Sequence, residues 1–284
     1  MIDQINAQTG HGVRLICQVL NLPRSSYYHA AQPTSRQVQD RELTELITKV
    51  FAEHKRRYGS RRIHAELVAQ GLECGVDRVR RLMREAGLRA HQPRSFIPTT
   101  SDGRADAPSP NLVLQRPAPT RPNEVWVSDF TYIPCGDAFV YLCVVMDLCS
   151  RRVIGWSLTN HMRSDLTTNA LRSALACRCH TKGVVIHSDR GSQYASKSFR
   201  QLLKTAGLEQ SMSARANPYH NAWSESVIGT LKSEMLRGGR FLNLQDAQLE
   251  IADYIDGYYN THRRHSSLNY LSPTAFEAQL ALEA

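Results

Sequence analysis

The chain has 284 residues, of which 42% are hydrophobic and 21% are charged, and its formal net charge is +9. This length accommodates two or three modules with at least one full core, and the composition is that of a globular protein. No apolar run reaches the ~20 residues of a membrane span, and the first residues lack the basic and apolar segments of a secretory signal. We therefore expect a cytoplasmic protein without a membrane partner.

The seven cysteines are odd in number and irregularly spaced, and no Cys-x-x-Cys motif occurs in the sequence. Cys177 and Cys179 form a single Cys-x-Cys pair. This pattern favours free thiols in a reducing compartment and gives no basis for a structural zinc site.

The positive charge is concentrated in the amino-terminal part. Residues 1–122 carry 19 Lys and Arg against 11 Asp and Glu, whereas residues 123–284 carry 16 against 15. The densest cluster is the segment 55–62, which contains Lys55, Arg56, Arg57, Arg61 and Arg62. Such a cluster can bind DNA phosphates with release of counterions, or it can be an ordinary solvated face. The clustering favours contact with DNA.

Helical patterns dominate the first 90 residues. We expect a short helical pair within residues 11–31 and a helix from about Arg36 to His54, which together form an amino-terminal helical region, 1–54. Residues 55–90 have the pattern of a helix-turn-helix, with Ser60 as the cap of a helix over Arg61–Ala69 and a second helix over Val76–Ala86.

Three arginines recur at three-residue intervals on this second helix and are expected to project outward: Arg78, Arg81 and Arg84. The helix could read bases in the DNA major groove, or the segment could be an ordinary helical hairpin with a solvated arginine face. Residues 91–122 hold seven of the twelve prolines and are expected to form an extended linker.

From Asn123 onward, strands and helices alternate, which predicts an α/β core over residues 123–240. The expected strands are Glu124–Ile133, Phe139–Asp147, Arg152–Leu158, Gly183–Ser188 and Leu208–Met212. The expected helices are Asp165–Cys177, Ser196–Ala206 and Asn221–Arg237, and a further helix over about Asp246–Tyr259 belongs to a carboxy-terminal extension, 241–284. This order of elements is compatible with several α/β folds.

Three acidic residues carry the chemical hypothesis. Asp129 lies in the middle of the first expected strand, Asp189 ends the fourth, and Glu225 lies on the last helix of the core, with 35 residues between it and Asp189. In a core of a sheet and helices, these carboxylates can converge on one edge, where their mutual repulsion favours divalent cations. Oxygen ligands suit Mg2+ or Mn2+, and such a site favours two-metal phosphoryl transfer. Each acid taken alone could equally be a solvated structural residue.

Several dispersed motifs resemble those of the second-frame (OrfB-type) transposases of two-frame bacterial insertion sequences. The matching segments are Pro122–Ile133, His187–Tyr194, Asn221–Ser226, Thr230–Glu234, Tyr259-Asn260, Arg263, His265-Ser266 and Ser272-Pro273. The resemblance covers about Tyr58 to Glu277. It implies a ribonuclease-H-like fold similar to retroviral integrase, with a mixed five-stranded sheet flanked by helices and preceded by an all-α helix-turn-helix region.

The resemblance also implies an activity. The expected enzyme is a DDE transposase that cleaves element ends and transfers strands, with Asp129, Asp189 and Glu225 as catalytic residues and as ligands of two Mg2+ or Mn2+ ions. Its expected partners are the terminal inverted repeats and target DNA, further copies of this chain on the DNA, and an upstream-frame protein or fusion. We expect it at the bacterial nucleoid. Ala216 and His220 stand where the family more often has Gly and Asp, which affects a loop and none of the three acids.

Other residues near the acids are candidates for DNA contact. Lys232 lies about two helical turns after Glu225 and on the same side of the helix, and the family has a basic residue there. Arg190 could bind a phosphate or form a surface ion pair, and Asn221 could cap its helix or bind substrate. The segment 262–265 could contact DNA or close the core through hydrogen bonds. Two alternatives to the transposase are a ribonuclease-H-like nuclease and a catalytically silent DNA-binding regulator.

Overall fold

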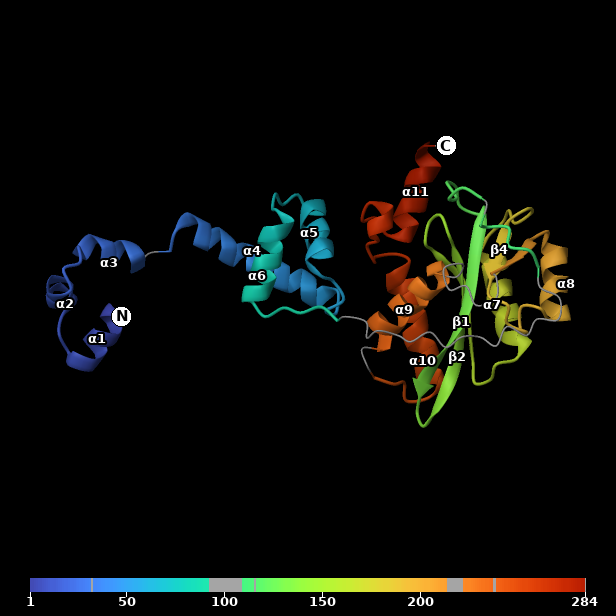
Figure 1. The fold of residues 1–284 in the computed structure, drawn as a ribbon, viewed down its shortest axis with the longest axis horizontal. Helices are drawn as coiled ribbons and strands as arrows, with labels where there is room; N and C mark the ends of the chain where they lie inside the picture. Colours follow the sequence, from blue (N-terminus) through green and yellow to red (C-terminus); the bar gives the residue numbers. More distant parts are fainter. Residues whose placement is uncertain (32, 92–108, 115, 214–221, 237–238, 284) are drawn as a thin grey trace. The chain divides into compact units, whose positions relative to one another are not determined.

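The structure, a computed structural model, describes residues 1–31, 33–91, 109–114, 116–213, 222–236 and 239–283, and the side chains of residues 26, 29–31, 222 and 224 lie outside this description. The chain divides into two compact units, Met1–Ala90 and His91–Ala284. Figure 1 colours the first unit blue to cyan and the elements of the second green to red. Within the described residues, no helix is both long and apolar enough to cross a bilayer.

The amino-terminal unit is helical. Its helices are α1 (Ile2–Thr9), α2 (Val13–Val19), α3 (Arg24–Ala31), α4 (Ser35–Glu53), α5 (Ser60–Ala69) and α6 (Val76–Glu85). Helices α4 to α6 bury one shared set of apolar side chains, which includes Ile47, Tyr58, Ile63, Leu67 and Val79. The expected helices from residue 36 to residue 86 are therefore confirmed to within two residues, whereas α1 has no counterpart among the expected elements.

Two local expectations for this unit are wrong. Gly59 occupies the N-cap of α5 and Ser60 is already helical, so no side chain caps the helix. Arg78 and Arg81 do not project freely, because each guanidinium binds the carboxylate of Asp40 at 2.6 Å. The hydrogen bond from Arg81 is the larger of two causes, and the one from Arg78 the smaller, that hold the pKa of Asp40 below its ordinary value. Since Asp40 belongs to α4, the expected boundary after residue 54 falls inside one packed unit.

The second unit is built on a mixed five-stranded sheet. Its strands are β1 (Val125–Cys135), β2 (Ala138–Asp147), β3 (Val153–Thr159), β4 (Val185–Ser188) and β5 (Glu209–Met212). Their order across the sheet is β3-β2-β1-β4-β5. The β1–β2 and β2–β3 pairs are antiparallel, whereas the β1–β4 and β4–β5 pairs are parallel. This topology confirms the predicted ribonuclease-H-like sheet.

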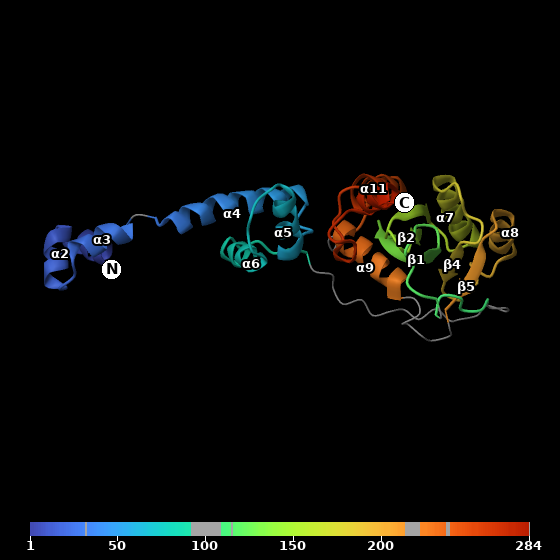
Figure 2. The same ribbon diagram turned by 90° about the horizontal axis from the view of Figure 1, so that it is seen from above.

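Helices cover both faces of the sheet, as the views in Figures 1 and 2 show. One face packs against α7 (Ser164–Cys177) and α8 (Lys197–Ala206), and the other against α9 (Ala222–Leu236) and α10 (Leu244–Ala252). Alternation along β1 supplies both cores, because Trp126 joins the α7–α8 side while Val125 and Val127 join the α9–α10 side.

The segments that flank the predicted core are part of this unit. At the end of the expected linker, the backbone N–H of Leu112 donates to Ser211 Oγ of β5 at 2.9 Å. After α10 the chain continues as a π-helix, Asp253–Tyr259, and ends in α11, Pro273–Glu283. The expected helix over 246–259 is therefore α-helical only in its first part, and its apolar stripe gave no sign of the change to π-helical winding. Helix α11 follows as a further helix of the carboxy-terminal extension.

A close backbone contact joins β3 to α7 at Gly155. A Cβ on Gly155 would lie 2.4 Å from both Ala170 O and Ala174 N, whereas a Cβ on Gly229 in α9 would meet no heavy atom within 4 Å. Gly155→Ala should therefore force α7 away from the sheet and lower the free energy of unfolding by about 3 kcal/mol.

Gly229→Ala is the matched control. It should leave stability unchanged or raise it by up to ~1 kcal/mol, because alanine is the better helix former. Urea denaturation of both full-length variants measures the difference. Equal free energies of unfolding for the two would show that the α7–β3 contact is not tight.

Candidate active site

The pairing of β1 with β4 places the first two acids side by side. Val127 is the partner of His187 in this parallel pair, so the same register continued by two residues sets Asp129 beside Asp189. Neighbouring strands lie about 4.8 Å apart, which brings the two acids to the same edge of the sheet. Asp129 lies within β1 and Asp189 directly follows β4, as the sequence predicts. Both side chains are half-buried.

Local backbone bonds orient both carboxylates. Asp129 Oδ1 accepts from the N–H of Phe130 at 2.8 Å, and Asp189 Oδ1 accepts from the N–H of Gly191 at 2.9 Å. A Cβ at Gly191 would lie 3.0 Å from that same Asp189 oxygen. A side chain at this position would therefore press on the Asp189 carboxylate and displace it by a few tenths of an ångström.

A buried polar cluster lies behind the two acids. Tyr194, which is fully buried, shares a 3.0 Å hydrogen bond with Ser128 Oγ, and its hydroxyl is 3.8 Å from Cys143 Sγ. Ser128 also donates to Val144 O at 3.0 Å. Because Ser128 precedes Asp129, this cluster ties the turn after β4 to the strand that carries the first acid.

The charges of both acids act on this buried cluster. Burial raises the pKa of Cys143 to about 12, with smaller contributions from the charges of Asp129 and Asp189. Burial likewise raises the pKa of Tyr194 well above its ordinary value, and the same two carboxylates add to the shift. A thiol and a phenol that remain protonated here are hydrogen-bonding and packing groups.

Helix α9 carries the third acid and the predicted lysine. Glu225 lies in its first turn and is exposed, and Lys232 is half-buried about two turns later. The Lys232 ammonium lies 4.4 Å from the centroid of the Tyr132 ring. Burial lowers the pKa of Lys232, while the carboxylate of Asp129 counteracts that shift. Lys232 is therefore close to both Asp129 and Tyr132.

A buried ion pair fixes α9 from its carboxy-terminal half. Arg263 donates to Glu234 at 2.6 and 2.8 Å, and Tyr254 donates to the same carboxylate at 2.8 Å. Burial opposes the charge of Arg263, but the hydrogen bonds of Glu234 raise its pKa above the ordinary value. The segment 262–265 was expected either to contact DNA or to close the core. Arg263 and the nearby His265 are both buried and hydrogen-bonded to each other, so these two residues help to close the core.

The described structure does not gather all three acids into one ligand set. Among the described residues, no group of three His, Cys, Asp or Glu side chains is close enough to hold a metal ion. Asp129 and Asp189 share the sheet edge, and Glu225 lies on the solvent-exposed first turn of α9, which directly follows residues 214–221, outside the described chain.

The predicted DNA-contact residues differ in their accessibility. Arg190 donates to Ser213 O at 2.8 Å, and Asn221 lies outside the described residues. In the basic cluster, Arg57 is only 8% exposed and the guanidinium of Arg62 lies 5.5 Å from the Tyr58 ring centroid. The remaining exposed candidates are Lys55, Arg56, Arg61 and Arg84.

Several structurally important residues were missing from the predicted site. Tyr194, Ser128 and Tyr132 lie inside the motifs that carry the family resemblance, which is the one signal that could have pointed to them. The Glu234–Arg263 pair spans 29 positions, and sequence periodicity carries no sign of it.

Comparison with known proteins gives first the class and then the family. Residues 119–218 and 206–273 match Integrase core domain families, and residues 38–96 match an HTH-like domain. Together with the sheet topology, these matches define an integrase-core protein of the ribonuclease-H-like fold with a helix-turn-helix-like region before it.

Proteins of bacterial insertion sequences are similar to this chain over most of its length. The Insertion element IS600 uncharacterized 31 kDa protein of Shigella sonnei is 39% identical over 263 residues, 92% of this chain and 97% of that protein. Transposase InsF for insertion sequence IS3A of Escherichia coli (strain K12) is 36% identical over 274 residues, 95% of each chain. A chain of the simian T-cell lymphotropic virus intasome in complex with PP2A regulatory subunit B56 gamma is 14% identical with a TM-score of 0.47, covering 81% of this chain and 74% of that chain.

This chain belongs to the IS3 family of insertion-sequence transposases.

The buried pair on α9 generates a stability prediction. Arg263→Ala should lower the free energy of unfolding by about 3–5 kcal/mol, because it leaves the carboxylate of Glu234 buried without its partner. Arg264→Ala, at the next position, removes a half-buried side chain that donates to Tyr270 O and should cost less than about 1.5 kcal/mol. Thermal and urea unfolding compare the two, and an equal loss would mean that the buried pair does not anchor the helix.

Proposed function

We propose that this chain catalyses metal-dependent cleavage of insertion-sequence ends and transfers the resulting strands into target DNA. Asp129, Asp189 and Glu225 are the proposed catalytic residues and ligands of Mg2+ or Mn2+, two ions in total. The observation that carries the proposal is the placement of two carboxylates at one sheet edge by the β1–β4 register, within an integrase-core family match.

The side chains fit such a metal. The carboxylates of Asp129 and Asp189 offer oxygen donors of the type that Mg2+ and Mn2+ prefer. Two neighbouring carboxylates repel each other, and the charges of both reach Tyr194 and Cys143 behind them. Glu225, at the start of α9, would complete the set from the helix side.

When bound, the metal ions would activate the attacking oxygen and stabilise the leaving one during in-line displacement. The protein residues supply binding and orientation. Asp129 and Asp189 are held by backbone N–H groups, and the Ser128–Tyr194 hydrogen bond keeps the strand and the turn together. Lys232, close to Asp129, would hold a phosphate of the reacting strand.

Hydrolysis and strand transfer then differ only in the nucleophile. A water molecule attacks the phosphodiester at an element end, breaks its P–O3′ bond and releases a 3′-OH. That 3′-OH then attacks a phosphorus of the target strand, forms a new P–O3′ bond and displaces the 3′ oxygen of the target strand, which leaves as a 3′-OH. The first step is a hydrolysis, which proceeds downhill in water. The second step exchanges one phosphodiester bond for another, so neither step needs ATP.

The amino-terminal unit is proposed to bind the terminal inverted repeats. Residues 1–90 carry 15 Lys and Arg against nine Asp and Glu, and residues 38–96 match the HTH-like domain. Assembly of several copies on DNA, fusion with an upstream-frame product and action at the bacterial nucleoid are further parts of the proposal, which the family resemblance implies. The relatives compared are bacterial proteins.

The first test neutralises each acid in turn. Asp129→Asn, Asp189→Asn and Glu225→Gln should each lower cleavage and strand transfer of labelled DNA ends by at least about a hundredfold, since each removes charge that the reaction uses. Melting temperature and DNA affinity should change little. Asp165→Asn, in the exposed first turn of α7, is the matched control and should keep wild-type activity. Near wild-type joining by any of the three variants would remove that residue from the site.

The second test separates the two units. A fragment of residues 1–90 should bind duplex DNA with a steep dependence on salt, because its excess of positive charge displaces counterions. A fragment of residues 91–284, which carries 20 Lys and Arg against 17 Asp and Glu, should bind more weakly. Fluorescence anisotropy at several salt concentrations gives both slopes, and equal affinities and slopes would overturn the division of labour.

A further inference from the structure

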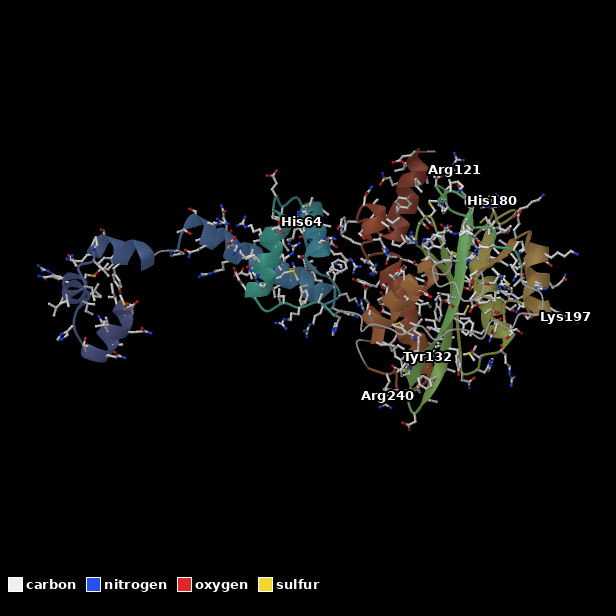
Figure 3. All side chains as sticks on the ribbon, viewed as in Figure 1. His64, Arg121, Tyr132, His180, Lys197 and Arg240 are labelled. Carbon is white, nitrogen blue, oxygen red and sulfur yellow. The ribbon has the colours of Figure 1, made fainter. Side chains whose placement is uncertain are left out.

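Two aromatic side chains stand exposed at the edge of the proposed active site. Tyr132 of β1 is 41% exposed and Phe139 of β2 is 50% exposed. Their ring centroids are 5.4 Å apart and their planes are nearly perpendicular, at 86°. Tyr132 is directly opposite Tyr141, so Phe139, two residues away, is its diagonal neighbour on the same face of the sheet. Figure 3 labels Tyr132 on β1.

The strand geometry places this pair close to the reacting centre. Tyr132 follows Asp129 by three residues, about 10 Å along a strand with a rise of about 3.3 Å per residue, and strand alternation turns the two side chains to opposite faces of β1. The pairing of β1 with β4 ends at Val127, and beyond it Lys232 approaches both Asp129 and the Tyr132 ring. Successive stacked nucleotides of one strand are about 3.4 Å apart. A DNA strand that passes around this side of β1 would therefore bring a base a few nucleotides from the phosphate at Asp129 to the Tyr132 ring, with Lys232 between the two.

Positive charge accompanies the aromatic pair. The ammonium of Lys232 lies 4.4 Å from the Tyr132 ring centroid and also interacts with Asp129. At the hairpin turn, the exposed Arg240 donates to Gly136 O at 3.1 Å. An aromatic platform flanked by cations suits the two parts of a single-stranded nucleotide, since the ring can stack on the base and the cations can bind the phosphates.

The platform is also held rigidly. The hairpin between β1 and β2 is clamped by the strand-like residue Phe241, which exchanges backbone hydrogen bonds with Pro134 and Gly136 at 3.1 and 2.8 Å. A stacking surface that is already fixed loses little conformational freedom when a base arrives.

We infer that Tyr132 and Phe139 form a stacking platform for an unpaired base of the DNA strand that reacts at Asp129, with Lys232 on the adjoining phosphate. This site rests on the proposed strand-transfer function and adds to it a preference for DNA ends whose last base pairs are open. Paired bases inside the duplex are stacked on both faces, so only a base freed from its partner can leave the stack and lie across the platform.

The test uses the full-length protein with two probes, in Ca2+ so that the DNA is not consumed. One probe is a duplex with a three-nucleotide single-stranded extension that carries 2-aminopurine, and the other is the same duplex fully paired. The wild type and Tyr132→Phe should quench 2-aminopurine fluorescence in the extension by stacking. Tyr132→Ala should abolish the quenching and weaken binding of the extended probe by about tenfold to a hundredfold, with little change for the paired probe.

Phe139→Ala provides a second variant with the same expected direction, and Leu249→Ala, which removes a 66% exposed side chain from α10, is the control. Quenching that survives Tyr132→Ala, or an equal loss of affinity for both probes, would overturn the platform. A strand-transfer assay on the wild type distinguishes failure of the platform from failure of the proposed function. If the wild type joins DNA and Tyr132→Ala still quenches the fluorescence, only the platform is disproved. A wild type that never joins DNA would disprove the proposed function itself.

Discussion

The parallel pairing of β1 with β4 is the constraint on which the rest of the site depends. Its register sets Asp129 beside Asp189, and a slip of one residue would turn one of the two side chains to the opposite face of the sheet. Two features secure that register. Apolar residues alternate between two separate cores along β1, and the Ser128–Tyr194 hydrogen bond joins β1 to the turn after β4. Packing of the two cores thus sets the positions of Asp129 and Asp189, although both side chains are only half-buried.

Helix α9 connects the chemistry to the carboxy-terminal segment. Its buried face joins the core on one side of the sheet, and the Glu234–Arg263 ion pair ties its second half to the chain after the π-helix. Such a pair contributes specificity of placement more than net stability, because its desolvation cost offsets much of the attraction. The consequence is that Lys232, between the two ends of α9, is held near both Asp129 and Tyr132.

The sequence predicted the order of strands and helices in the second unit almost completely, because long apolar runs and clear turn residues bound each element there. It also placed Asp129 within the first strand and Asp189 at the end of the fourth. It could not predict interactions between distant residues, such as Arg81 with Asp40 or Arg263 with Glu234, since periodicity reports only which face of an element is buried. The outward direction assigned to Arg78 and Arg81 failed for that reason. The exposed Tyr132 was overlooked because alternation in a strand predicts burial but not the neighbours of an exposed ring.

The central claim is that Asp129 and Asp189 together hold a divalent cation beside bound DNA. The most direct measurement is Mn2+ binding, by electron paramagnetic resonance, to the full-length protein in complex with a DNA duplex. Asp189→Asn serves as the comparison, and DNA alone gives the background. The account predicts specific Mn2+ binding to the wild-type complex that the variant loses in large part. Equal Mn2+ binding by the wild-type and variant complexes, or none above the background of DNA alone, would contradict it.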